Sequence, residues 1–72
     1  MTNKEKLNLL EELLDIQRNT LTEDTSLNNL EEWDSMAVIA TIAMFDSDFG
    51  KVISADEVKA FRTIRDIMAE MD

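Results

Sequence analysis

The chain has 72 residues, with no cysteine and no histidine, and sixteen acidic against seven basic residues give a formal net charge of −9. Without these two residue types, disulfides, thiolate metal sites and Ser–His or Cys–His catalytic pairs are excluded, so an enzyme acting alone is not expected. A chain this short forms one domain at most, here over residues 1–72. Its acidic field favours basic protein surfaces over nucleic acid or anionic lipid.

The apolar residues are not arranged for a membrane or for export. Lys4, Glu5 and Lys6 are not followed by the long apolar run of a signal peptide. No apolar stretch approaches the roughly 18 residues that a membrane span needs. The lack of cysteine fits a reducing compartment. We therefore expect a cytoplasmic protein without membrane insertion.

The first helix is predicted to start at Thr2, which forms a capping box with Glu5, and to fade near Arg18. Its expected apolar stripe is Leu7, Leu10, Leu13 and Leu14, and its expected solvent face is Glu11, Glu12 and Asp15. Residues 19–33 are rich in polar residues and predict a long loop. Leu21, Leu27, Leu30 and Trp33 are its expected anchors in the core.

The second helix is predicted to open at Asp34, a strong N-cap residue, and to end at Gly50, which tolerates a positive φ. Its expected buried stripe is Met36, Ile39, Ile42, Ala43 and Phe45.

Two further helix starts are predicted near the C-terminus, at the Ser54–Glu57 and Thr63–Asp66 pairs. They indicate a short helix around 56–60 and a final helix around 64–71. The apolar positions there are Val58, Phe61, Ile64, Ile67, Met68 and Met71. The sequence therefore predicts an all-α fold, a small bundle of three main helices and one short helix around a single core.

Ser35 follows the capping Asp34, so its hydroxyl is expected at the first turn of the second helix. Unpaired N–H groups and the positive end of the helix dipole favour an anion at that place, which suits a phosphodiester on the serine. If a cofactor attached through this phosphodiester ended in a thiol, that thiol could hold a cargo, and the chain itself would need no cysteine.

Four features occur in order along the chain: Trp33-Asp34-Ser35-Met36, the helix through Phe49, Val52-Ile53 and the Thr63-Ile64 helix start. In these features the chain resembles the acyl carrier protein family, over nearly its whole length. The family usually has Leu at the position of Met36. The resemblance implies a four-helix acyl-carrier fold. It also implies 4'-phosphopantetheine transferred from coenzyme A to Ser35 by a phosphopantetheinyl transferase, with Asp34 and Met36 flanking the attachment point.

The resemblance also implies a pocket that shelters the acyl chain, with Met36, Ile39, Ala43 and Phe45 in it or in its walls. It further implies a monomer whose partners are acyl-transferring or acyl-activating enzymes, and these enzymes have basic docking patches. The partner-binding residues it implies are Ala37, Ile39, Ala40, Asp46 and Asp48. Ala37 and Ala40 stand where fatty-acid carriers tend to have carboxylates, so partner specificity is expected to differ. A specialised pathway, such as secondary metabolism or surface-glycan acyl transfer, is one hypothesis beside fatty acid biosynthesis.

Two alternatives need neither a modified serine nor a carrier role. Asp46, Asp48, Gly50 and Glu57 occupy positions 1, 3, 5 and 12 of a degenerate calcium loop, but position 5 offers no side-chain ligand and position 6 is Lys51 instead of glycine. No metal site is therefore predicted. The second alternative is an acidic helical module that docks a basic partner without any modification of Ser35.

Overall fold

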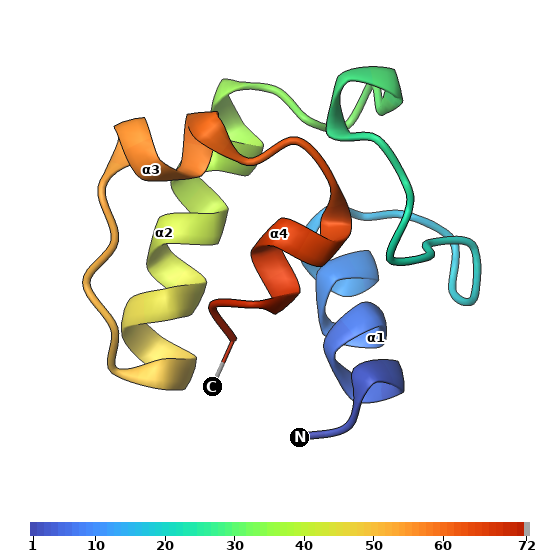
Figure 1. Cartoon of the computed structure of the whole chain (residues 1–72), viewed down its shortest axis with the longest axis horizontal. Helices are drawn as coiled ribbons and strands as arrows, with labels where there is room; N and C mark the ends of the chain where they lie inside the picture. Colours follow the sequence, from blue (N-terminus) through green and yellow to red (C-terminus); the bar gives the residue numbers. More distant parts are fainter. Residues whose placement is uncertain (72) are drawn as a thin grey trace.

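The computed structural model describes residues 1–71, in which four α-helices follow one another along the chain (Figure 1). They are α1 (Asn3–Leu13), α2 (Ser35–Phe49), α3 (Ala55–Ala60) and α4 (Ile64–Met68), with a 3₁₀ turn, η1 (Leu27–Asn29), in the long connection after α1. Helix α4 lies between α1 and α2, and α3 packs against α2 (Figure 1). The predicted all-α carrier-like bundle is confirmed. None of these helices combines the length and hydropathy of a bilayer crossing.

One hydrophobic core joins all four helices and the long connection. Its centre consists of the largest fully buried apolar side chains, which are Leu10, Leu27, Phe45, Val58, Ile64, Ile67 and Met71. Leu21 is also buried, while Leu30, Trp33 and Phe61 are partly buried against the core. The four apolar residues predicted to anchor the long loop therefore do contact the core.

The predicted helix starts are confirmed by their capping bonds. Thr2 and Glu5 form the reciprocal capping box, with 2.8 Å from the Thr2 N–H to the Glu5 carboxylate and 3.1 Å from the Glu5 N–H to the Thr2 hydroxyl. The Ser54 hydroxyl accepts from the Glu57 N–H at 3.1 Å. Gly50 ends α2 with φ of 59°, in the left-handed region that favours glycine.

The buried face of α2 agrees with the predicted stripe at Phe45, which is fully buried, but differs from it at the other positions. The buried residues of this helix are Ala37, Val38, Thr41, Met44 and Phe45, whereas Met36 and Ile39 are 71% and 61% exposed. Ala43 is also exposed and Ile42 is half-buried. The prediction was wrong for Met36, Ile39 and Ala43 because α2 is apolar on nearly every side, so helical periodicity alone does not select one stripe. Thr41 is accommodated in the core because its hydroxyl donates to the Ala37 carbonyl at 2.8 Å.

Helix α1 ends earlier than predicted. Asp15 adopts a left-handed φ of 55°, and the Ile16 N–H donates to the Glu11 carbonyl at 2.8 Å. A left-handed residue followed by such a bond closes a helix and satisfies its last carbonyls. The chain therefore leaves the helix at Leu14, not near Arg18.

Glu11 was predicted on the solvent face of α1 but is only 2% exposed. One of its carboxylate oxygens accepts from the backbone N–H groups of Thr20 and Leu21, both at 2.9 Å. Burial acts to raise the pKa of Glu11, but backbone N–H groups of Leu21, Asn19 and Thr20 outweigh it and lower that pKa. Glu11 therefore fastens the first part of the long connection to α1.

The second half of the long connection is hydrogen-bonded to the start of α4. Ser26 and Thr63 form an isolated antiparallel β-bridge. Around it, the Leu27 N–H donates to the Arg62 carbonyl at 2.9 Å and the Ile64 N–H to the Thr25 carbonyl at 3.0 Å. These bonds and the buried leucines hold the segment that leads to α2 in a fixed place.

Helix α4 is shorter than the predicted segment 64–71. After Met68 the chain continues with i to i+3 bonds from Glu70 to Ile67 and from Met71 to Met68, which tighten the last turn. Two lysines from other parts of the chain donate to carbonyls of this turn, Lys51 to Glu70 at 2.8 Å and Lys6 to Met68 at 3.3 Å. Met71 still reaches the core, as predicted.

Candidate functional site

Ser35 is the first residue of α2, and its side chain lies at the surface. The preceding Asp34 is the N-cap, in extended backbone geometry, and its carboxylate accepts from the Ala37 N–H at 2.9 Å. The first bond of the helix runs from the Val38 N–H to the Asp34 carbonyl at 3.1 Å. Capping by Asp34 therefore sets the serine at the very start of a 15-residue helix.

The first turn of α2 leaves backbone donors beside the Ser35 hydroxyl. The N–H groups of Ser35 and Met36 come before that of Val38, the first one bonded to a carbonyl of the helix, so neither has a carbonyl partner within the helix. These donors and the positive end of the helix dipole stabilise negative charge at the serine, by about 0.3–1 kcal/mol at an exposed helix end. The arrangement is therefore suited to an anionic group on the Ser35 oxygen.

The segment before Ser35 is held in place by short-range turns. The Trp33 N–H donates to the Leu30 carbonyl at 3.2 Å, and the Asp34 N–H donates to the Glu32 carbonyl at 3.1 Å. Leu30 and Trp33 pack against the core from this segment. Ser35 therefore follows a backbone segment that is anchored to the core, and its side chain is exposed.

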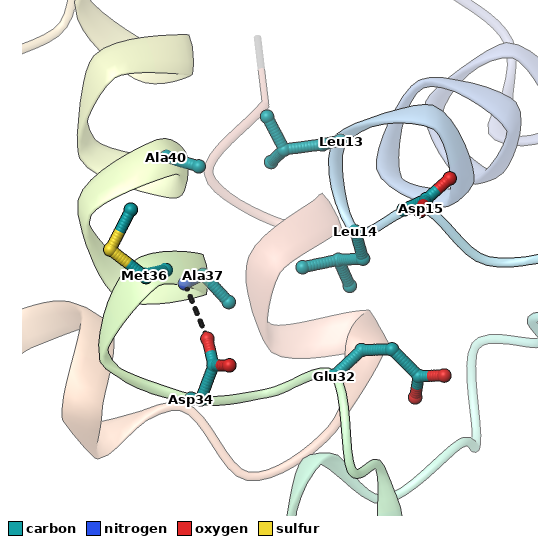
Figure 2. Close-up of a pocket in the computed structure, with 8 residues that line it drawn as sticks. All are labelled: Leu13, Leu14, Asp15, Glu32, Asp34, Met36, Ala37 and Ala40. Atoms are coloured by element: carbon teal, nitrogen blue, oxygen red, sulfur yellow. Dashed lines mark hydrogen bonds between the residues drawn. The ribbon is translucent and has the colours of Figure 1, made fainter.

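A groove of about 490 Å³ lies next to the start of α2, between this helix and the end of α1 (Figure 2). Its apolar lining consists of Leu13, Leu14, Met36, Ala37 and Ala40. Asp15, Glu32 and Asp34 complete the lining, and Figure 2 shows the Asp34 carboxylate bonded to the Ala37 N–H. The groove is therefore lined by Asp34 and Met36, the two chain neighbours of Ser35.

The other residues predicted at the site lie along α2 at different depths. Ile39, Asp46 and Asp48 are exposed, Ala40 is half-buried and Ala37 is buried at 7% exposure. Of the residues expected to shelter an acyl chain, Phe45 is fully buried. Ile39 and Ala43 line a second, apolar groove beside residues 51–53.

The geometry does not support the calcium-loop alternative. Asp46 and Asp48 belong to the last turn of α2, and Glu57 belongs to α3, so the segment is not an open loop. Within residues 1–71, no three acidic side chains gather in a group that could hold a metal ion.

Comparison with known proteins returned one family. The family model for the phosphopantetheine attachment site matches residues 7–71, and no curated protein and no solved structure matched the sequence. The match confirms the predicted 4'-phosphopantetheine prosthetic group and the prediction that the chain is not an enzyme, since domains of this family carry their cargo without catalysing its conversion. The chain therefore belongs to the phosphopantetheine attachment site family, the domains of carrier proteins.

Proposed function

We propose that Ser35 is the attachment residue, and that the chain carries acyl intermediates as thioesters on its arm to partner enzymes. The observation that supports this most is the position of Ser35, exposed at the first residue of α2 directly after the capping Asp34. Ser47 is also exposed but belongs to the last turn of the same helix. It lacks the free N–H groups and the positive dipole end that favour a phosphodiester.

The residues at the start of α2 fit this group. The phosphopantetheine thiol supplies the thioester chemistry, and the chain needs no cysteine of its own. In the modification, the Ser35 oxygen forms a bond to the phosphorus next to the pantetheine of coenzyme A. The pyrophosphate bond breaks, adenosine bisphosphate leaves, and the hydroxyl proton passes to a base of the transferase. The N–H groups of Ser35 and Met36 offset the charge that the phosphodiester retains.

The Asp34 carboxylate lies close to this anion, but its hydrogen bond to the Ala37 N–H offsets part of its charge. The Asp34 carboxylate thus caps α2, while the N–H groups of Ser35 and Met36 remain available to the phosphodiester. The groove beside α1, lined by both apolar and acidic residues, is the surface on which we expect the arm to lie.

The partners in this proposal are a phosphopantetheinyl transferase and enzymes that load or remove the acyl group. A specialised pathway is favoured over fatty acid biosynthesis because α2 contains no charged residue between Ser35 and Phe45. Enzymes that recognise a carboxylate-rich helix would find few contacts there. A single domain over 1–72, a monomeric state and a cytoplasmic location remain predictions.

The test is the intact mass of the protein after incubation with coenzyme A and a broad-specificity phosphopantetheinyl transferase. Wild type and Ser47→Ala should each gain one phosphopantetheine, whereas Ser35→Ala should gain none. Circular dichroism should show all three proteins equally helical, because both serines are exposed. Modification of Ser35→Ala, or of no variant at all, would contradict the proposal.

A further inference from the structure

The chain carries its sulfur in methionine alone, because it has five methionines and no cysteine. Three of them, Met44, Met68 and Met71, are buried in the core at 4% exposure or less. The other two are Met1 and Met36, which are 66% and 71% exposed. An oxidant in solution therefore reaches the thioethers of Met1 and Met36 and does not reach those in the core.

Met36 is the exposed methionine that lies beside the proposed attachment residue. It follows Ser35 directly in α2, and its side chain lines the groove between α1 and α2 (Figure 2). The Met36 N–H is also one of the first-turn donors that have no carbonyl partner within the helix. A chemical change in the Met36 side chain is therefore a change at the attachment point itself.

A peroxide converts the thioether of an exposed methionine into a sulfoxide. A sulfur lone pair attacks one oxygen of hydrogen peroxide, the O–O bond breaks, and the departing hydroxide takes the proton of the oxygen now bound to sulfur. Sulfur thus loses two electrons, and the peroxide is reduced to one water. The sulfoxide is polar and chiral, and methionine sulfoxide reductases reverse the reaction. Leucine, the usual residue of the family at this position, has no such chemistry.

We propose that Met36 is an oxidation site, and that its sulfoxide slows the transfer of phosphopantetheine to Ser35. The inference rests on the proposed function, because it takes Ser35 as the residue that receives the group. Peroxide thus lowers the rate at which new carrier is loaded, and reduction of the sulfoxide restores that rate.

The first reason for the slower transfer is the hydration of the sulfoxide oxygen. The side chains that line the groove within residues 1–71 are apolar or carboxylates, so they offer this oxygen no hydrogen-bond donor. Its partners are then water molecules, some of which leave when coenzyme A and the transferase close over Ser35. Covering a polar group without replacing its hydrogen bonds is unfavourable, and the apolar thioether of Met36 has no such cost.

The second reason is the charge of the same groove. Asp15, Glu32 and Asp34 line it, and among the described residues no basic side chain does. The sulfoxide oxygen adds the negative end of a dipole there, where coenzyme A must bring its anionic phosphates. It is also an acceptor that competes for the N–H groups of Ser35 and Met36, the donors that favour the phosphodiester. Both effects act against transfer.

The experiment measures kcat/KM of the transferase reaction for wild type and Met36→Leu, each before and after treatment with hydrogen peroxide. Catalase removes the peroxide before coenzyme A and the transferase are added. Met36→Leu keeps Met1 and Trp33, so it controls for oxidation elsewhere in the chain. Each protein is compared with its own untreated sample, so an effect of the substitution on the basal rate does not enter the comparison.

Tandem mass spectrometry of the treated wild type should place added oxygen on Met36 and Met1, with Met44, Met68 and Met71 unoxidised. Treatment should lower kcat/KM of wild type about tenfold and change that of Met36→Leu by less than about twofold. Methionine sulfoxide reductases of both stereospecificities, with dithiothreitol, should restore the wild-type value. Circular dichroism should show treated and untreated samples equally helical, because the oxidised side chains lie at the surface.

Several results overturn the inference while the proposed function stands. They are a Met36 that peroxide leaves unoxidised, a sulfoxide protein that reacts at the untreated rate, and a Met36→Leu variant that slows as much as wild type. A treated wild type that unfolds, or that stays slow after the sulfoxide has been reduced, overturns it too, since the cause then lies elsewhere. An untreated wild type that is never modified overturns both the inference and the proposed function.

Discussion

Asp34 positions Ser35 by capping the helix that begins with it, and a substitution can separate this role from the charge of Asp34. Asp34→Ala removes the acceptor of the Ala37 N–H, so we expect a loss of about 1 kcal/mol in the free energy of unfolding. Asp34→Asn keeps an oxygen acceptor and should lose only a few tenths of that value. Urea denaturation of the three proteins measures both changes. Equal losses in the two variants would mean that capping is not what Asp34 contributes.

Glu11 is a second residue whose polar contacts determine backbone structure, since its carboxylate accepts from the N–H groups of Thr20 and Leu21. At pH 7 we expect Glu11→Gln to unfold with about 1 kcal/mol less free energy than wild type, because a charged acceptor binds N–H groups more strongly than an amide. Its other carboxylate oxygen is buried without a hydrogen-bond partner. Replacement of that oxygen by an NH₂ group adds a donor in a place that offers no acceptor, which acts in the same direction.

We also expect the difference in the free energy of unfolding between wild type and Glu11→Gln to depend on pH. Because folding lowers the pKa of Glu11 from its ordinary 4.5, its contribution to stability is present above that value and is lost as the pH falls through the folded pKa. The difference between wild type and Glu11→Gln should therefore shrink below about pH 4.5. Urea denaturation of both proteins from pH 7 to the acid limit of folding measures the difference. A constant difference over that range would show that Glu11 does not act through its charge.

At the scale of the elements, the sequence predicts where helices start better than which face they bury. Thr2, Asp34 and Gly50 mark ends of α1 and α2 as expected, because caps are local bonds between neighbours in the chain. The buried face of α2 could not be read in the same way, since an all-round apolar helix admits more than one stripe. Only its packing against α3 and the core selects Val38 over Ile39.

The burial of Glu11 was missed although the sequence contains a signal for it. Residue 11 lies four positions after Leu7 and three before Leu14, within the apolar stripe of α1. A carboxylate at such a position needs partners, and those partners proved to be backbone N–H groups beyond the helix. The bridge between Ser26 and Thr63 could not be predicted at all, because it joins two irregular segments that carry no strand pattern.

At the scale of the whole molecule, a formal net charge of −9 acts against compaction. The ion pair between Arg65 and Asp24, at 2.8 Å, lies at the surface, where such pairs contribute little. We therefore expect the melting temperature to rise by several degrees between about 10 mM and 500 mM NaCl, since salt screens the repulsion between carboxylates. Thermal denaturation followed by circular dichroism measures this, and a flat melting temperature would contradict it.

Calcium provides the control for that measurement. At equal ionic strength, calcium and magnesium chloride should raise the melting temperature alike, because the acidic residues 46, 48 and 57 lie on two helices and form no common site. A selective effect of micromolar calcium on Trp33 fluorescence would instead restore the calcium-binding alternative.

The whole account depends on one covalent bond at Ser35, and peptide mapping of the modified protein tests it most directly. Cleavage after Arg18 and Lys51 yields a peptide of residues 19–51, which contains Ser26, Ser35 and Ser47. Fragmentation of this peptide by tandem mass spectrometry should place the phosphopantetheine on Ser35 alone. Phosphopantetheine on Ser26 or Ser47, or on a different peptide, would contradict the assignment of the start of α2 as the attachment site.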